Sequence, residues 1–215
     1  MKIYIINPDY GMSRELMNKE LSILSRYVNI DVELAMDCLS ETVVEINSLA
    51  DAIKAGPEVS RMALRAEQKG FDAIILYCFS DPGYELCKKT LQVPVYGCAK
   101  ASLEYASKNY QGNIGVVLTD ISREEEKRSF ISKLGLDEKR FLFAAVDIAN
   151  ISCWDNRKLV QERLTKTCQS LAAKNVSCII LGCTSFLGLS EELTLVCDTR
   201  VLDPAVCGLK AATKE

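Results

Sequence analysis

Short runs of apolar residues, rich in Ile, Val and Leu, recur along the chain and alternate with longer stretches in which apolar positions follow a helical period. Continuous apolar runs of this kind are typical of strands that are buried on both faces of a parallel sheet. Strands that alternate with helices indicate an α/β fold with helices on both faces of the sheet. Eight strands are predicted, at residues 2–6, 30–34, 72–77, 93–96, 113–118, 141–146, 177–181 and 200–202.

Turn and capping residues predict where two of the helices begin and end. Pro57 is expected in the first turn of a helix that ends at Gly70, because proline is tolerated where a helix begins and glycine favours its end. Ser122, followed three residues later by Glu125, matches a capping box, and Gly135 is expected to end that helix. Both helices therefore lie between predicted strands, as an α/β fold requires.

The two halves of the chain are similar to each other. Residues 74–78 read Ile-Ile-Leu-Tyr-Cys, and residues 179–183 read Ile-Ile-Leu-Gly-Cys. The two cysteines stand 105 residues apart in a chain of 215, which is close to half of its length. We interpret this as an internal duplication. It predicts two pseudo-symmetric lobes, each with a four-stranded, mainly parallel sheet flanked by helices, and an active site in the cleft between the lobes.

Charged residues are nearly balanced, with 26 basic and 29 acidic side chains and a formal net charge of −3. No run of Lys or Arg forms a nucleic-acid footprint, and no apolar stretch approaches the roughly 20 residues of a membrane span. The apolar run near the N-terminus is too short for a signal peptide. We therefore expect a cytoplasmic protein that binds neither nucleic acid nor a membrane and keeps its cysteines reduced.

The histidine and cysteine content narrows the chemistry. Histidine is absent, which excludes a Ser-His-Asp triad, a Cys-His dyad and any His-ligated metal site. Ten cysteines are present, but no two form a Cys-x-x-Cys motif, which argues against a zinc ribbon, an iron–sulfur cluster or a thioredoxin-type centre. Most free cysteines are small buried hydrophobic residues. This packing role is expected for Cys87, Cys98, Cys153, Cys168, Cys178, Cys197 and Cys207.

Cys78 and Cys183 stand where a predicted buried strand gives way to the next helix. Ligands of open α/β sheets bind beyond the carboxyl ends of the strands, and a helix N-terminus lowers the pKa of a thiol placed there. The duplication predicts that the two sulfurs face one another across the cleft. One thiolate and one thiol in this arrangement suit the removal of a proton from a stereogenic carbon and its return to the opposite face. Either cysteine taken alone is better explained by simple packing, and it is the matched pair that favours catalysis.

Five motifs follow one another along the chain: Ile-Asn-Pro-Asp at residues 6–9, Cys-Phe-Ser-Asp-Pro-Gly at 78–83, Val-Pro-Val-Tyr-Gly at 93–97, Leu-Gly-Cys at 181–183 and Val-Leu-Asp-Pro at 201–204. Taken in this order, they resemble the motifs of the aspartate/glutamate/hydantoin racemase superfamily, and most closely those of its hydantoin and allantoin racemase branch. The Cys-Phe-x-Asp-Pro-Gly motif is the most specific of the five, whereas Leu-Gly-Cys-Thr is shared across the superfamily.

The resemblance implies a cofactor-independent racemase or epimerase that acts on a small-molecule substrate, with Cys78 and Cys183 as its acid–base pair. Loop donors would hold the substrate's oxygens and stabilise the enolate. This substrate-binding role is expected of Asn7, Phe79, Ser80, Thr119, Thr184 and Ser185. The resemblance also implies a homo-oligomer, and a C-terminal segment that packs on the first lobe. Residues 1–97 and 205–215 would then form the first lobe, and residues 98–204 the second.

The chain departs from the pattern of the branch at three places. Asp9 stands where Asn is usual, Ser80 stands where Gly is common, and Thr184 and Ser185 replace smaller residues. The amino-acid racemases of the superfamily commonly carry His or Glu after Cys-Thr. Ser185 cannot take that acid–base role because its hydroxyl does not titrate in the range of those groups. These departures bear on the substrate rather than on the type of reaction.

The residues leave several functions open. In a 5-substituted hydantoin or allantoin the ring carbonyls acidify the carbon–hydrogen bond, so that two thiols suffice. Aspartate or glutamate carries an ionised carboxylate, which makes proton removal harder and calls for cations or strong hydrogen-bond donors. Neither cysteine loop contains Lys or Arg, which favours the cyclic ureide. A cis–trans isomerase of this fold, which also uses a cysteine pair, and a ligand-binding protein without turnover are alternatives. The related decarboxylases lack the first cysteine.

Overall fold

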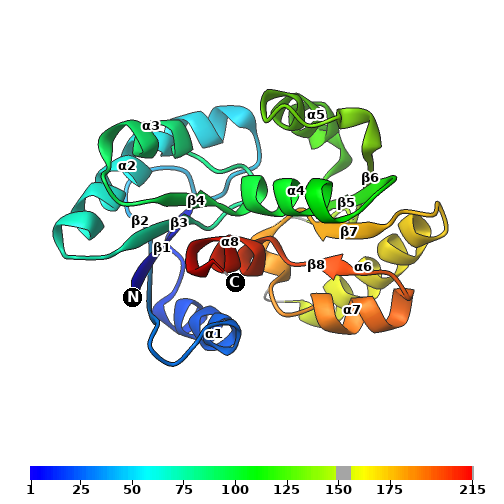
Figure 1. The fold of residues 1–215 in the computed structure, drawn as a ribbon, viewed down its shortest axis with the longest axis horizontal. Helices are drawn as coiled ribbons and strands as arrows, with labels where there is room; N and C mark the ends of the chain where they lie inside the picture. Colours follow the sequence, from blue (N-terminus) through cyan, green and yellow to red (C-terminus); the bar gives the residue numbers. More distant parts are fainter. Residues whose placement is uncertain (149–155, 215) are drawn as a thin grey trace. The chain divides into compact units, whose positions relative to one another are not determined.

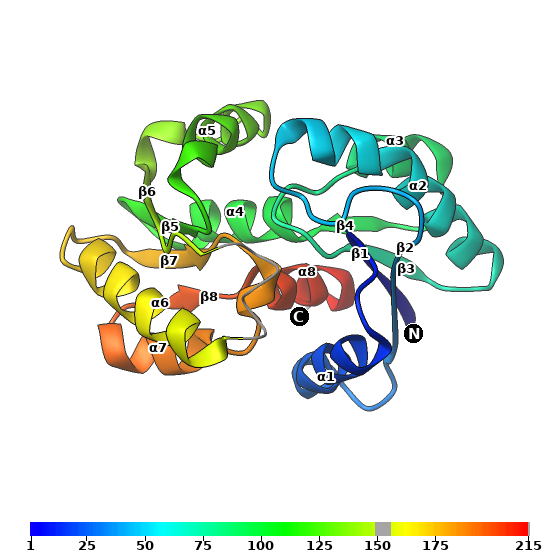
Figure 2. The ribbon, with the colours of Figure 1, turned by 180° about the vertical axis from the view of Figure 1, so that it is seen from behind.

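The chain forms two compact units of α/β structure. In the computed structural model, which describes residues 1–148 and 156–214, the first unit comprises Met1–Ala101 with Ala205–Glu215, and the second comprises Ser102–Pro204. Each unit contains one four-stranded sheet, and every strand pair that the structure describes is parallel. Helices flank both sheets (Figures 1 and 2). The predicted fold class is therefore confirmed.

The first unit alternates strands and helices along the chain. Its elements are β1 (Lys2–Tyr10), α1 (Arg14–Leu24), η1 (Ser25–Tyr27), β2 (Glu33–Leu39), α2 (Leu49–Gln68), β3 (Ala73–Leu76), α3 (Tyr84–Thr90), β4 (Val95–Gly97) and α8 (Pro204–Thr213). The strand order is β2-β1-β3-β4. One face of the sheet is covered by α2 and α3, where Val59 of α2 joins Ile74 and Leu76 of β3 in the core. On the opposite face α8 brings Gly208 close to Ile75.

The second unit repeats this organisation. Its elements are β5 (Ile114–Leu118), η2 (Ile121–Arg123), α5 (Glu124–Lys133), η3 (Glu138–Arg140), β6 (Phe141–Ala145), α6 (Arg157–Ala172), β7 (Cys178–Leu181), η5 (Thr184–Phe186), α7 (Ser190–Cys197) and β8 (Val201–Leu202). The helix α4 (Cys98–Asn109) belongs to both units, because the division of the chain falls within it. The strand order is β6-β5-β7-β8, which matches the first sheet strand for strand. In the core, Val160 and Leu164 of α6 pack with Val117 and Ile179 of the sheet.

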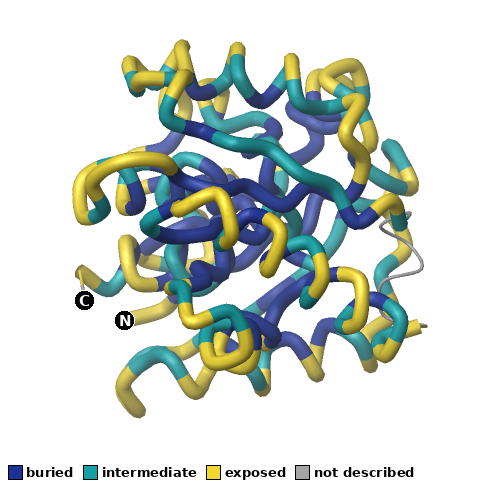
Figure 3. The backbone as a smooth tube through the Cα atoms, turned by 90° about the vertical axis from the view of Figure 1, so that its right-hand side faces the viewer, coloured by how far each residue is buried: buried dark blue, intermediate teal, exposed yellow. Residues whose placement is uncertain are grey.

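Three of the four central strands are buried along their whole length, as their continuous apolar sequences predict. Every residue of β3, β5 and β7 is buried. Figure 3 colours the buried parts of the backbone dark blue. Burial on both faces follows from helices that pack on each side of a parallel sheet. None of the described helices combines the length and the apolar character that crossing a lipid bilayer requires.

Two predicted strand boundaries are wrong. The second strand is Glu33–Leu39 rather than residues 30–34, because Ile30 is fully exposed in the preceding turn and pairing with β1 begins only at Glu33. β1 runs to Tyr10 rather than ending at residue 6, because its pairing with β2 continues through an irregularity between Asn7 and Tyr10. A mostly apolar pattern did not reveal which residues pair with a neighbouring strand.

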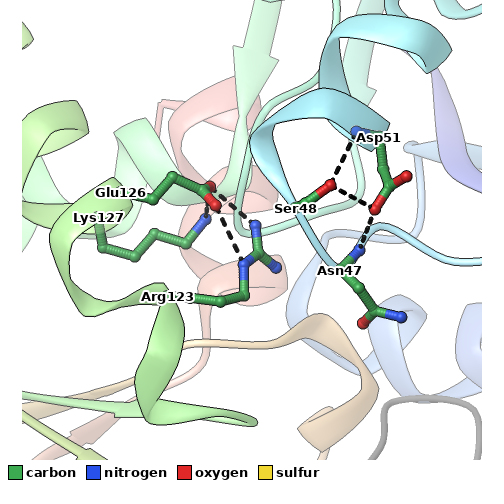
Figure 4. Close-up of polar contacts among 6 residues, drawn as sticks. All are labelled: Asn47, Ser48, Asp51, Arg123, Glu126 and Lys127. Carbon is green, nitrogen blue, oxygen red and sulfur yellow. Dashed lines mark hydrogen bonds and ion pairs between the residues drawn. The ribbon is translucent and has the colours of Figure 1, made fainter.

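Two helices begin differently from the prediction. Ser48 caps α2: its hydroxyl accepts a hydrogen bond from the amide of Asp51 at 3.1 Å and donates one to the Asp51 carboxylate at 2.7 Å (Figure 4). Pro57 is therefore inside the helix, where it leaves the carbonyl of the exposed Ile53 without its helical partner. Because Ile53 lies on the solvent side, water can satisfy that carbonyl. The predicted end at Gly70 agrees with its left-handed backbone, at φ +82°.

The helix predicted to begin at Ser122 is preceded by a short 3-10 helix, η2. Asp120 caps η2, because its carboxylate accepts a hydrogen bond from the amide of Ser122 at 2.8 Å. α5 continues directly from η2, and Ser122 is therefore not its N-cap. Gly135 has a left-handed backbone at φ +75° immediately after the helix, as its predicted role at the helix end requires.

Candidate active site

Cys78 lies just beyond the carboxyl end of β3. Ile6 of β1 pairs with Leu76 of β3, so Asn7 follows the pair on one strand and Cys78 follows it on the other. The amide of Tyr77 donates to the carbonyl of Ile6 at 2.9 Å, which keeps the two chain segments together past the end of the ladder. The structure therefore places Cys78 and Asn7 at the same edge of the first sheet, as predicted.

Asp81 connects the Cys78 loop to the first turn of α4. It is 5% exposed, and its two carboxylate oxygens accept hydrogen bonds from the amides of Ala99 at 3.0 Å and Lys100 at 2.8 Å, in the first turn of α4. Gly97 leaves room for this contact, since a Cβ there would lie 2.2 Å from Cγ of Asp81. The Asp of the Cys-Phe-Ser-Asp-Pro-Gly motif thus caps a helix and holds the cysteine loop in place.

Phe79 and Ser80, two of the predicted substrate-binding residues, belong to the same loop. Phe79 is buried, whereas Ser80 is half-buried. Gly83 ends the loop with a left-handed backbone at φ +78°, and a Cβ there would lie 2.9 Å from the carbonyl oxygen of Gly56 in α2. Close contact between two backbone segments explains why this end of the motif requires glycine.

Asn7 and Asp9 form a second polar group at this sheet edge. The Asn7 amide donates from Nδ2 to Sδ of Met12 at 3.0 Å, and its Oδ1 accepts from the amide of Asp9 at 3.4 Å. The Asp9 carboxylate accepts from the amide of Ile46 at 3.2 Å. Burial, and to a smaller degree the carboxylate of Glu45, raises the pKa of Asp9 to about 6. The departure from Asn at this position therefore places a group that titrates near neutral pH beside Asn7.

Cys183 lies just beyond the carboxyl end of β7, in the position that Cys78 has after β3. Val117 of β5 pairs with Leu181 of β7, and Thr119 and Cys183 each stand two residues beyond that pair. Thr119 is 8% exposed and Cys183 is half-buried. Gly182 lies directly against β5, where a Cβ would be 2.6 Å from the carbonyl oxygen of Val117. The structure thus brings Thr119 and Cys183 to one edge of the second sheet.

The Cys183 loop also contains the two remaining predicted residues, Thr184 and Ser185, which lie in η5. The sulfur of Cys183 lies 2.8 Å from the hydroxyl oxygen of Ser185, within hydrogen-bond distance. Thr184 is buried. Asp203, from the Val-Leu-Asp-Pro motif, is 3% exposed and accepts a hydrogen bond from the amide of Gly188 at 3.2 Å. A buried carboxylate therefore fixes each cysteine loop, Asp203 in this unit and Asp81 in the first.

Both cysteines stand in the turn between a strand and the next helix, as predicted, but neither lies at the N-terminus of that α-helix itself. α3 begins six residues after Cys78, and α7 begins seven residues after Cys183. The loops between them contain left-handed residues, including Gly83 and Gly188, and an α-helix cannot contain such residues. Cys183 instead precedes the single turn η5 directly.

Sequence reasoning missed Arg157, the first residue of α6. Its guanidinium donates from Nη1 to the carbonyl of Ser185 at 2.7 Å and from Nη2 to the carbonyl of Leu187. Neither cysteine loop carries its own basic residue, but a distant helix supplies one to the Cys183 loop. No local pattern in the sequence signals this contact, because Arg157 stands 26 residues before Cys183.

Two further cations near Thr119 in sequence are engaged in ion pairs. Glu126 of α5 binds Arg123 at 2.8 Å and Lys127 at 3.1 Å (Figure 4). Burial alone would raise the pKa of Glu126, but Lys127 and Arg123 outweigh it and lower the pKa below its ordinary value. Lys127 is 3% exposed. Glu126 therefore neutralises part of the positive charge that Arg123 and Lys127 carry in the segment after β5.

The other cysteines show what a packed thiol looks like in this chain. Burial raises the pKa of Cys87 to about 11 and of Cys178 to about 12, and burial together with Cys197 raises that of Cys168 to about 12. Cys98 is also buried, and Cys197 and Cys207 are half-buried. Cys153 lies outside the described residues. Among the described residues, no group of three or more Cys, Asp or Glu side chains is arranged to hold a metal ion.

Comparison with known proteins decides the family. Residues 5–212 match the family model of the Asp/Glu/hydantoin racemases, which is nearly the whole chain. The chain belongs to the Asp/Glu/hydantoin racemase family. As a member of that family it is an isomerase of the racemase class, as its motifs predicted.

The relatives of this racemase include hydantoin, allantoin and glutamate racemases. A hydantoin racemase of Rhizobium meliloti is 23% identical over 213 residues, which are 99% of this chain and 87% of the relative. The structure of an allantoin racemase from Klebsiella pneumoniae is 22% identical, with a TM-score of 0.89 over 100% of this chain and 86% of that one. A glutamate racemase from Bacillus anthracis is 15% identical, with a TM-score of 0.67 over 99% of this chain and 80% of that one. The two solved structures share the fold of this racemase.

Proposed function

We propose that this racemase inverts the stereogenic carbon of a cyclic ureide, a 5-substituted hydantoin or allantoin, and uses Cys78 and Cys183 as its two bases without a cofactor. The observation that carries the proposal is the equivalent placement of the two cysteines, each two residues beyond the paired end of the third strand in its sheet. The family membership and the hydantoin racemase relative support the reaction and the substrate class.

The chemistry balances with two thiol groups alone. The thiolate of one cysteine takes the proton from the carbon beside the ring carbonyl, and the electron pair of that bond moves onto the carbonyl oxygen as an enolate. The thiol of the other cysteine then gives its proton to the opposite face of the carbon, and the enolate returns to the carbonyl. The two cysteines end with their protonation states exchanged, so the next turnover can run in the reverse direction. The mechanism requires one substrate molecule to reach both sulfurs.

The loop residues are proposed to bind the substrate's oxygens and to stabilise the enolate. Asn7, Phe79 and Ser80 would act from the first unit, and Thr119, Thr184 and Ser185 from the second. Arg157 donates two of its N–H groups to backbone carbonyls, which makes the guanidinium part of the Cys183 loop. Neither cysteine loop contains a Lys or Arg of its own, which favours an uncharged ureide over an acidic amino acid. We also propose that the racemase works in the cytoplasm as a homo-oligomer, with lobes formed by residues 1–97 and 205–215 and by residues 98–204.

Proton NMR in deuterated water tests the proposed function. The panel comprises allantoin, several 5-substituted hydantoins, aspartate and glutamate, and each rate is corrected for exchange without enzyme. The proposal expects loss of the hydrogen at the stereogenic ring carbon of a ureide, together with loss of optical rotation. Exchange only in aspartate or glutamate would assign the chain to acidic amino acids instead. No exchange in any compound would overturn the two-base racemase.

A further inference from the structure

Arg157 holds the loop that carries Cys183 at two points. Its Nη1 donates to the carbonyl of Ser185 at 2.7 Å, and its Nη2 donates to the carbonyl of Leu187. We propose that Arg157 is a positioning residue that fixes the Cys183 loop in the geometry that proton transfer needs. This inference rests on the proposed function, because it assigns Arg157 a role in the reaction of Cys183.

Ser185 links the guanidinium to the sulfur. Its carbonyl is held by Arg157, and its hydroxyl lies 2.8 Å from the sulfur of Cys183. The backbone of Ser185 decides where that hydroxyl points. η5 is a single 3-10 turn, closed by hydrogen bonds of 3.3 and 3.0 Å, and such a turn is weak without outside support. The planar fork of an arginine suits two carbonyls at once, which a lysine cannot bind in the same way.

The guanidinium also brings the loop a positive charge that the loop itself does not possess. Residues 182–189 read Gly-Cys-Thr-Ser-Phe-Leu-Gly-Leu and contain no charged side chain. A nearby cation favours the ionised form of a thiol. We therefore expect Arg157 to act on Cys183 in two ways, through the geometry of Ser185 and through the charge it places on the loop.

The same helix offers a matched control in Arg163. Its Nη1 donates to the carbonyls of Val146 at 3.0 Å and Asp147 at 2.8 Å, in the segment that follows β6. Arg163 thus also joins α6 to two backbone carbonyls, but these do not belong to the Cys183 loop. Loss of either arginine removes the same kinds of bond, so a change seen with Arg157 alone reflects the loop rather than the helix.

The experiment compares Arg157→Ala, Arg157→Lys and Arg163→Ala in the full chain. Substrate exchange gives kcat and KM. Alkylation by iodoacetamide, followed on the Cys183 peptide by mass spectrometry across a pH series, gives thiolate reactivity without any substrate. We expect Arg157→Ala to lower kcat about 10²-fold with little change in KM, the loss that a small misplacement of a reacting group produces. Its alkylation profile should move to higher pH, Arg157→Lys should fall in between, and Arg163→Ala should match the wild type.

Chemical rescue separates positioning from a general loss of stability. Millimolar methylguanidinium should restore part of the activity of Arg157→Ala, because the free ion can bind the two vacated carbonyls, and it should not affect Arg163→Ala. Equal kcat values and equal alkylation profiles for folded Arg157→Ala and Arg163→Ala would overturn the inference. If the alanine variant does not fold, the comparison of Arg157→Lys with Arg163→Lys decides in the same way. A wild-type chain that turns over no substrate would refute the proposed function, while the alkylation series would still test Arg157.

Discussion

The hydroxyl oxygen of Ser185 lies 2.8 Å from the sulfur of Cys183, and both residues belong to one short loop of the second unit. A hydroxyl at this distance can donate a hydrogen bond to a thiolate and stabilise it, since hydrogen bonds to ionised groups are the stronger ones. Ser185 cannot exchange protons as the His or Glu of the amino-acid racemases would. It can act on Cys183 only through this hydrogen bond, and through contact with the substrate.

Replacement of Ser185 by alanine tests that hydrogen bond. A bond to a charged group contributes about 1.5–3 kcal/mol, so Ser185→Ala should slow the reaction roughly 10- to 100-fold and move the rise of activity to higher pH. Ser185→Thr keeps a hydroxyl and should retain most of the activity. The measurement is the pH dependence of kcat/KM. An alanine variant with the wild-type profile would show that the contact has no role in the ionisation of Cys183.

The two cysteines should differ from all others in the effect of a serine substitution. Cys78→Ser and Cys183→Ser should each abolish racemisation and leave the fold intact, because one face of the substrate loses its acid or base. Each single variant can still exchange the hydrogen of one enantiomer, since one thiol remains. NMR exchange on the separate enantiomers measures this, with Cys207→Ser in α8 as the control. Racemisation at the wild-type rate in either variant would contradict the two-base mechanism.

Gly97 should be far less tolerant of alanine than an open glycine of the same chain. A Cβ at Gly97 would lie 2.2 Å from Cγ of Asp81 and would push the carboxylate off the first turn of α4. We expect Gly97→Ala to cost at least 3 kcal/mol, roughly two lost hydrogen bonds to a charged group. Gly135 has a left-handed backbone but nothing within 4 Å of a Cβ, so Gly135→Ala should cost about 1 kcal/mol.

Urea denaturation of both variants gives these free energies. The double variant Asp81→Ala with Gly97→Ala removes the clash, so its loss of stability should be smaller than the sum of the two single losses. Additive losses would show that the two positions do not meet. Activity should fall with Gly97→Ala as well, because Asp81 holds the loop of Cys78.

Local patterns were enough to predict the buried strands β3, β5 and β7 and the position of each cysteine just beyond a strand. Continuous apolar runs identified the central strands because parallel strands are covered on both faces, and the residues that follow such a strand must lie at its carboxyl end. The pattern failed at Ile30, an apolar residue that is fully exposed. It also failed at Pro57, which lies inside a helix because that helix begins earlier, after the N-cap Ser48. The strand boundary depends on a distant partner, because pairing with β1 decides where β2 begins. The helix start was a local signal, because Ser48 and Asp51 form the cap only three residues apart.

The contacts of the site were harder to predict than its cysteines. The bond between Arg157 and the carbonyl of Ser185 joins a helix to a loop 28 residues further along the chain, and backbone carbonyls leave no signature in a sequence. Asp81 could be recognised as part of a motif, but its partners in α4 could not, because the first turn of α4 comes beside it only in the folded sheet. Motif residues can thus be identified from sequence while their separate roles in structure and chemistry cannot.

Asp9 should make the stability of the chain depend on pH between about 4 and 6. Burial raises the pKa of its carboxyl to about 6 in the folded chain, against an ordinary value of 3.8, so the folded state binds the proton more tightly than the unfolded state. The contribution of Asp9 to stability is therefore fully present below about pH 3.8 and is lost as the pH rises to 6. At pH 7.5 the loss amounts to at most about 3 kcal/mol, because one pKa unit corresponds to about 1.4 kcal/mol.

The Asp9→Asn variant cannot ionise at this position and keeps an acceptor for the amide of Ile46. At pH 7.5 it should therefore be more stable than the wild type by about 1 to 3 kcal/mol, which is about the size of that loss. The two should converge at pH 4. Urea denaturation at pH 4, 5, 6 and 7.5 measures the difference, and Glu45→Gln, which removes a carboxylate that raises the pKa of Asp9, should recover a smaller part of it. A difference between Asp9→Asn and the wild type that stays constant across the series would show that the Asp9 carboxyl does not titrate in this range.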